Sequence, residues 1–142
     1  MLLEIGNLLR YKTYTANKNA EFAGKKLESY ATLTEIPHFT YDSIVAKAKH
    51  IDVVWFVGEE EEFPALVYEI DTSPAFHRSL LKFTDLHHFD AQFRLVSSHA
   101  HQQQFRDEMK REIFQNIREQ IKFLTYEIVE EMYESSLKRD FT

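Results

Sequence analysis

The sequence predicts a fold of the α/β class with a mixed sheet of the α+β kind. Its elements are expected in the order helix, strand, strand, strand, helix, strand, helix. Two neighbouring apolar runs, 51–57 and 65–71, have the composition of strands and flank a loop that suits a hairpin. A helical pattern then separates the second run from a further strand at 93–97. A hairpin followed by a strand–helix–strand crossover combines antiparallel and parallel pairs in one sheet.

The first fifty residues supply the opening helix and strand. A helix is predicted over 2–10 because its apolar residues recur at helical spacing: Leu2, Ile5, Leu8 and Leu9. The Tyr- and Thr-rich segment 11–16 favours a strand, and a turn follows at 17–20. A short helix is expected within 21–32. Asp42 is expected to cap another helix from 43 to 49.

The second half of the chain is predicted to be mainly helical. Thr72, Ser73 and Pro74 form a helix-start signal, so a helix is expected from there to about residue 89. Residues 102–137 lack Gly and Pro and predict one long helix or two. The apolar stripe from Phe105 to Leu124 either covers the sheet, which we favour, or joins two copies in a homodimer.

Length and composition bound the class of protein. The 142 residues predict a single domain spanning 1–142, and 44% hydrophobic residues make it globular. The uncapped opening helix favours a domain from the C-terminal part of a longer protein, with a further N-terminal domain before it. No apolar run approaches the roughly 20 residues of a membrane helix, and no signal peptide is visible. The absence of cysteine excludes zinc–thiolate sites and thiol catalysis, and fits a cytoplasmic protein.

Charge is distributed unevenly along the chain. The net charge of −6 does not by itself predict nucleic-acid binding. Residues 1–50 hold seven Lys or Arg against five acids, whereas 51–100 hold three against nine. Many of these acids lie in the strand pair and in its loop, Glu59 to Glu62. An acidic centre could hold a metal while basic residues elsewhere hold phosphate, but an ordinary acidic protein would show the same balance.

Three acids lie in the two central apolar strands: Asp52, Glu69 and Asp71. Side chains alternate along a strand, so Glu69 and Asp71 share a face, and Asp52 joins them if the strands are neighbours. Acid inside apolar strands is costly unless it is paired or bound to metal. The group therefore predicts a divalent-cation site. The alternatives are a salt bridge at a sheet edge for Asp52 and a helix cap for Asp71.

The order of elements and the spacing of the acids resemble the restriction-endonuclease-like, or PD-(D/E)xK, nuclease superfamily. Asp52 matches the first acid of its motif, and Glu69-Ile70-Asp71 stands where (D/E)xK is expected, 17 residues later. The resemblance implies a restriction-type endonuclease domain that hydrolyses DNA with Mg²⁺ or Mn²⁺. Asp52 and Glu69 would bind the metal, with the Ile70 carbonyl as third contact.

The third motif position departs from the family pattern, because Asp71 stands where Lys is usual. Some members of the superfamily resemble this pattern, and in them the acid is thought to bind metal or activate water. Asp71 is accordingly expected as a third metal ligand and catalytic residue. Lys82 or Lys12 could replace the missing lysine, and the sequence does not select between them. The alternative function is a catalytically inactive domain of the same fold that binds DNA or another protein.

Histidine pairs give no metal site of their own. His87 and His88 are adjacent on a predicted helix and diverge by 100°, so they cannot easily share an ion. His99 and His101 could share one in a strand, but no third ligand is placed beside them. Zinc is therefore not expected.

Overall fold

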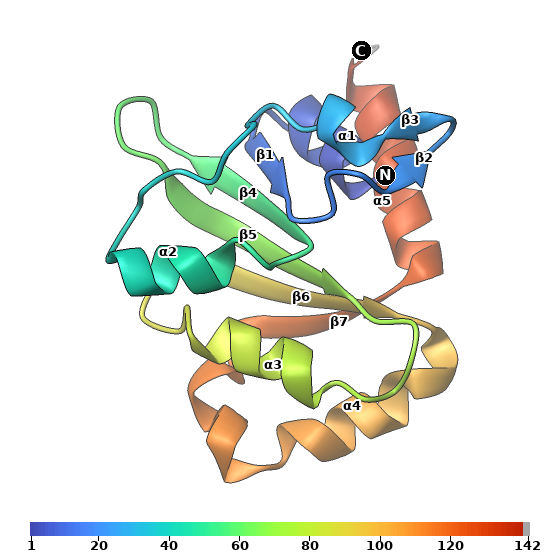
Figure 1. The fold of residues 1–142 in the computed structure, drawn as a ribbon. Coiled ribbons are helices and arrows are strands. Elements are labelled where there is room, and N and C mark those ends of the chain that lie inside the picture. The colour runs from blue at the N-terminus through green and yellow to red at the C-terminus, as the bar shows by residue number, and fades with distance from the viewer. Residues whose placement is uncertain (141–142) are drawn as a thin grey trace.

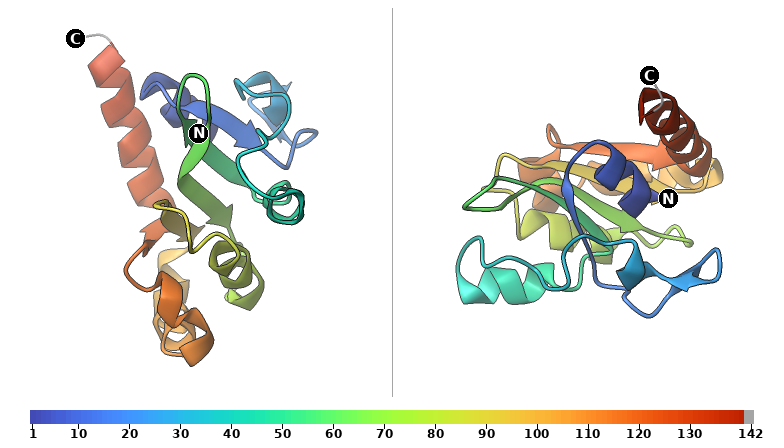
Figure 2. Two further views of the ribbon diagram at one scale, coloured as in Figure 1. Left: turned by 90° about the vertical axis from the view of Figure 1, so that its left-hand side faces the viewer. Right: turned by 90° about the horizontal axis from the view of Figure 1, so that it is seen from above.

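The computed structural model describes residues 1–140 and contains a five-stranded sheet between two layers of helices (Figures 1 and 2). The strand order is β1-β4-β5-β6-β7. The pairs β1–β4 and β4–β5 are antiparallel, and β5–β6 and β6–β7 are parallel. This confirms the predicted mixed sheet. The strands are β1 Lys12–Thr15, β4 Val53–Val57, β5 Phe63–Ile70, β6 Gln92–Ser97 and β7 Ile121–Thr125.

The helices divide between the two faces of the sheet. One face carries α1 (Leu2–Leu8) and α5 (Tyr126–Asp140), and the other carries α2 (Asp42–Ala48), α3 (His77–Thr84) and α4 (Gln102–Met109) (Figure 2). Short 3₁₀ turns span Leu27–Ser29, His99–His101 and Glu112–Ile117. None of the helices in residues 1–140 combines the length and hydrophobicity of a membrane span.

Each face of the sheet has its own apolar core. Beneath α3, the rings of Phe83 and Phe93 stack with centroids 5.0 Å apart. Beneath α1, Trp55 is buried and its indole nitrogen donates to the Leu2 carbonyl at 3.2 Å. Gly6 is required there, because a Cβ atom at residue 6 would lie 2.6 Å from that nitrogen. The sheet is thus packed on both faces, which fixes the positions of the side chains at the ends of β4 and β5.

The predicted helix within 21–32 is wrong. That segment forms a two-stranded ribbon, β2 (Glu21–Phe22) and β3 (Lys25–Lys26), followed by a 3₁₀ turn. The turn residues Ala23 and Gly24 have φ angles of 52° and 80°, a left-handed conformation that ends any helix. The ribbon is exposed on both strands, so no apolar face was available to stabilise a helix there.

Two predicted helix boundaries shift. The helix expected from residue 74 to about 89 is α3, from His77 to Thr84. It starts later because residues 74–76 form a turn, in which the Phe76 amide donates to the Pro74 carbonyl at 3.0 Å. It ends earlier because a tight turn follows, in which the Leu86 amide bonds to the Phe83 carbonyl at 2.9 Å. Asp42 is the first residue of α2, not its cap, and bonds to His38.

The prediction of one or two helices over 102–137 holds only at the two ends of the segment and is wrong in the middle. The segment contains α4, a 3₁₀ turn, the fifth strand β7 and α5. Residues 121–125 become a strand because β6 offers them a parallel partner in full register, an interaction that overrides helical periodicity. Phe105 and Ile117 from the predicted stripe are buried in the core. The stripe therefore helps to build the core, and the homodimer stays a prediction.

Candidate functional site

The start of β4 and the end of β5 bring two acids together. Asp52 immediately precedes β4, and the antiparallel register sets it opposite Glu69. The Asp52 amide donates to Glu69 Oε2 at 2.8 Å. In return, the Ile70 amide donates to Asp52 Oδ2, also at 2.8 Å. Acids 17 positions apart in the sequence are thus locked by reciprocal side chain-to-backbone hydrogen bonds.

Glu69 is held in the interior by a lysine from α3. Its side chain is 2% exposed, and it is the one charged residue among 1–139 that is fully buried. Lys82 Nζ lies 2.7 Å from Glu69 Oε1 and also donates to the His50 carbonyl at 3.1 Å. A buried carboxylate needs such a partner, because removing it from water costs far more than an unpaired charge can recover.

The site is short of positive charge. Burial and, second, the neighbouring Asp52 carboxylate raise the pKa of Glu69, which lies at about 7 after all contributions. The hydrogen bonds from Lys82 and from the Asp52 amide oppose this rise without cancelling it. The ion pair with Lys82 is therefore too weak to hold the carboxylate fully ionised at neutral pH. A carboxylate with such a raised pKa marks a candidate functional site. A further cation nearby would favour its ionised form.

Asp71 lies two residues after Glu69 and on the same face of the sheet. Ser79 Oγ on α3 donates to Asp71 Oδ2 at 2.7 Å, so Glu69 and Asp71 both point toward α3. Burial raises the pKa of Asp71, and the hydrogen bond from Ser79 counteracts part of that shift. Ser97 on β6 donates to the Asp71 carbonyl at 2.7 Å and fixes the backbone. Asp71 is thus a constrained side chain at the site and not a helix cap.

The end of β1 and the turn that follows it hold Asp52 in place. Asn17 Nδ2 donates to Asp52 Oδ1 at 2.8 Å, and Thr15 Oγ1 donates to the Asp52 carbonyl at 2.7 Å. The sequence analysis missed both residues and also Ser79. Ser79 could have been found, because it lies three positions before Lys82 and therefore on the same helix face. Nothing in the sequence marked Asn17.

The structure brings Lys82, and not Lys12, to these acids. Lys12 Nζ instead lies 3.6 Å from Glu62, beyond the opposite end of β4. Within residues 1–140 no group of three or more His, Asp or Glu side chains could hold a metal ion. The assignment of Asp52, Glu69 and Asp71 as metal ligands stays a prediction.

Comparison with known proteins adds the family. All 142 residues match the family model described as the type II restriction enzyme NmeDI C-terminal domain. The chain belongs to this family. It is thus a restriction-enzyme-related domain, which agrees with the class of protein that the strand acids predicted. Neither the curated proteins nor the solved structures that were searched match the chain.

Proposed function

We propose that this NmeDI C-terminal-type domain is a metal-dependent endonuclease that hydrolyses DNA phosphodiester bonds. The observation that carries the proposal is the buried Glu69, joined to the Asp52 amide at 2.8 Å and to Lys82 at 2.7 Å. Two acids and a lysine are the PD-(D/E)xK set, with the lysine supplied by α3 in place of the strand. The family match to a restriction enzyme supports DNA as the substrate.

The donor atoms at the site fit Mg²⁺ or Mn²⁺. Asp52 and Glu69 would supply carboxylate oxygens. The Ile70 amide bonds to Asp52, so the Ile70 carbonyl lies on the same edge of β5 and would be the third ligand. Mg²⁺ commonly keeps several waters and needs few protein ligands. Such an ion would polarise the phosphate and lower the pKa of a bound water.

The side chains of the domain would carry the remaining roles. The attacking water forms a bond to phosphorus while one phosphorus–oxygen ester bond breaks. The proton of the water passes to the Asp71 carboxylate, and the leaving oxygen takes a proton from solvent. The Lys82 ammonium stabilises the negative charge that develops on the phosphate. Asp71 would thus stand at the motif position where lysine is usual, and Lys82 would supply the lysine from α3.

A non-catalytic domain on the same scaffold is the second candidate. Two observations favour it. Lys82 already forms an ion pair with Glu69. Within residues 1–140, no group of three or more His, Asp or Glu side chains could hold a metal ion. Such a domain would bind DNA or another protein without cutting. A second copy to cut the opposite strand belongs to the catalytic proposal, whereas a preceding domain of the same protein is compatible with both candidates.

Cleavage of supercoiled plasmid with Mg²⁺ or Mn²⁺ tests the proposal. The wild type is expected to nick or linearise the plasmid, and Asp52→Ala, checked for folding by circular dichroism, is expected not to. A range of plasmid sequences is needed, because a restriction-type enzyme can depend on a recognition site. Absence of cleavage by folded wild type on all of them, with either metal, would favour the non-catalytic candidate.

A further inference from the structure

Buried hydroxyl groups gather at the candidate site. Seven polar or charged residues are buried among 1–139, and four of them lie here: Thr15, Glu69, Ser79 and Ser97. Burying a hydroxyl is unfavourable unless it forms a hydrogen bond. The hydroxyls of Thr15, Ser79 and Ser97 each donate a hydrogen bond to Asp52 or Asp71 at 2.7 Å. Two of them bond to backbone carbonyls, and only Ser79 bonds to a carboxylate.

Ser79 makes a different bond from two other helical hydroxyls. Thr84 and Ser136 donate to the carbonyl four residues earlier in their own helices, Leu80 at 2.9 Å and Met132 at 2.8 Å. That local bond is the usual choice for a serine inside a helix. Ser79 is only the third residue of α3, so the carbonyl four residues before it, that of Ala75, precedes the helix. Its hydroxyl is 5% exposed and donates out of the helix to Asp71 instead.

The surroundings leave Asp71 one main freedom, the rotation of its side chain. Its amide donates to the Val96 carbonyl at 2.9 Å, and its carbonyl accepts from Ser97. These bonds fix the backbone to β6. Ser79 engages Oδ2 only, and among residues 1–139 no donor bonds to Oδ1. The hydroxyl thus sets the orientation of the carboxylate and leaves one oxygen able to accept a hydrogen bond.

The geometry points to Ser79 as a positioning residue for the hydrolytic step. It holds Asp71 so that the free carboxylate oxygen accepts the hydrogen bond of the attacking water. Ser79 and Lys82 lie three residues apart on one face of α3, and the buried Leu80 and Phe83 anchor that helix. One rigid helix therefore orients both the acid and the lysine. This inference rests on the proposed function and names how its acid is aligned.

A double-mutant cycle tests the inference. Ser79→Ala is expected to lower kcat by about ten- to a hundredfold, the value of a hydrogen bond to a charged group, with little change in KM for DNA. In an Asp71→Asn background, the same change is expected to cost less than about threefold, since the carboxylate that it aligns is already lost. Ser79→Thr keeps the hydroxyl and is expected to restore most of the rate.

A matched control and a second readout separate alignment from stability. Ser136→Ala removes another buried helical hydroxyl, remote from the site, and is expected to keep wild-type kcat. Urea unfolding without metal should show that Ser79→Ala destabilises the wild type more than the Asp71→Asn variant. Equal loss of kcat in both Asp71 backgrounds would overturn the inference, as would wild-type kcat in Ser79→Ala. If the wild type itself cuts no DNA, the proposed function fails first, and this inference fails with it.

Discussion

The two ends of the β4–β5 hairpin carry the same kind of side chain in opposite surroundings. At one end, Glu69 is 2% exposed and bonds to Lys82. At the other end, the loop Glu59 to Glu61 is solvent-exposed, and Glu62 forms only a loose pair with Lys12 at 3.6 Å. The loop is denser in acid than the site. Acid density alone therefore does not identify a site, whereas burial with specific partners does.

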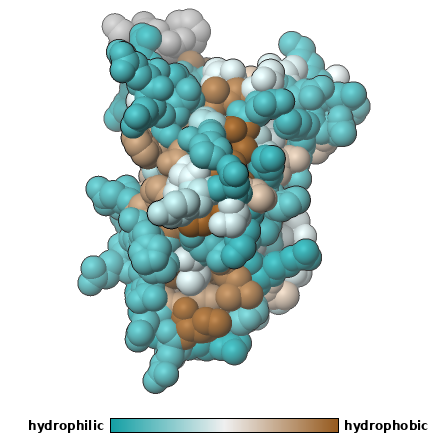
Figure 3. Space-filling view, turned by 60° about the vertical axis from the view of Figure 1, so that its left-hand side comes forward, coloured by the Kyte–Doolittle hydropathy of each residue, from teal (hydrophilic) through white to brown (hydrophobic). Residues whose placement is uncertain are grey.

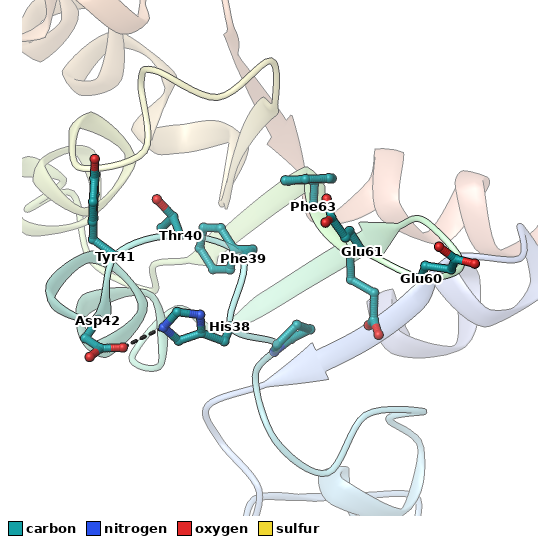
Figure 4. A pocket seen from close by; sticks show the side chains of 10 residues that line it. His38, Phe39, Thr40, Tyr41, Asp42, Glu60, Glu61 and Phe63 are labelled. Carbon is teal, nitrogen blue, oxygen red and sulfur yellow. Dashed lines mark hydrogen bonds and ion pairs between the residues drawn. The ribbon is translucent and has the colours of Figure 1, made fainter.

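A hollow at the loop end sharpens this contrast. It has a volume of about 840 Å³ and lies between the loop and the segment 37–42 (Figure 4). Tyr41 and Phe63 are exposed beside it, and His38 pairs with Asp42 at the surface. On this side of the molecule the surface is mainly hydrophilic, with separate apolar patches (Figure 3). Its volume is in the range of ligand pockets, but only one of its carboxylates, Glu62, is partly buried, so its size alone does not indicate function.

The largest expected effect separates the two ends by substituting one glutamate at each. Glu69→Ala should lower DNA cleavage by about a thousandfold or more, because several kcal/mol of stabilisation from the metal are lost. Glu61→Ala should cleave like the wild type. Plasmid cleavage rates measured on folded variants check this. Comparable losses at both ends would contradict the distinction.

The two lysine pairs provide the next test. Lys82→Met should lower cleavage by about a hundredfold, the usual effect of losing one group that stabilises charge in the transition state. It should also destabilise the protein, because Glu69 stays buried without its partner. Lys12→Met removes the partly buried pair with Glu62, and should leave the cleavage rate unchanged and lower the urea midpoint less than Lys82→Met does. Equal effects of the two changes on rate and urea midpoint would show that Lys82 has no special role.

Sequence reasoning succeeded where local pattern and burial agree. The strands at β4, β5 and β6 and the face shared by Glu69 and Asp71 follow from period-two alternation. The fifth strand could not be predicted, because residues 121–125 become a strand only by pairing with β6. The contacts of Asn17 and Ser79 depend on tertiary packing. The choice of Lys82 over Lys12 needed the three-dimensional positions of both ends of the hairpin.

The pH dependence of stability offers a third test. The folded-state pKa of Glu69 is about 7, above the unfolded value of about 4.3, so the folded protein binds this proton more tightly. The resulting stability is fully present below about pH 4.3 and is lost as pH rises through 7. Without metal, the urea midpoint should fall between about pH 4.3 and about pH 7 and level off above that.

Neutral substitutions assign this pH effect to one end of the hairpin. Glu69→Gln should flatten most of the fall in urea midpoint, because the titrating group is gone. A smaller slope should remain, since burial also raises the pKa of Asp71. Glu61→Gln should keep the wild-type slope. An unchanged slope in Glu69→Gln would contradict the raised pKa.

The smallest expected effect concerns the exposed support of Asp52. Asn17→Ala removes one hydrogen bond to Oδ1, and the Ile70 amide still holds Oδ2. Cleavage should fall by about fivefold, in line with about 1 kcal/mol for a typical hydrogen bond. Asn19→Ala, in the same turn, is the matched control and should keep the wild-type rate. A loss in both variants would point to the turn itself instead of the bond to Asp52.

Titration calorimetry with Mn²⁺, without DNA, tests most directly whether the buried end of the hairpin is a metal-dependent site. The wild type and Glu61→Ala should bind Mn²⁺ with the same affinity, and Glu69→Ala should bind at least tenfold more weakly, the equivalent of about 1.4 kcal/mol. No binding by wild type, or equal binding by all three proteins, would contradict the account.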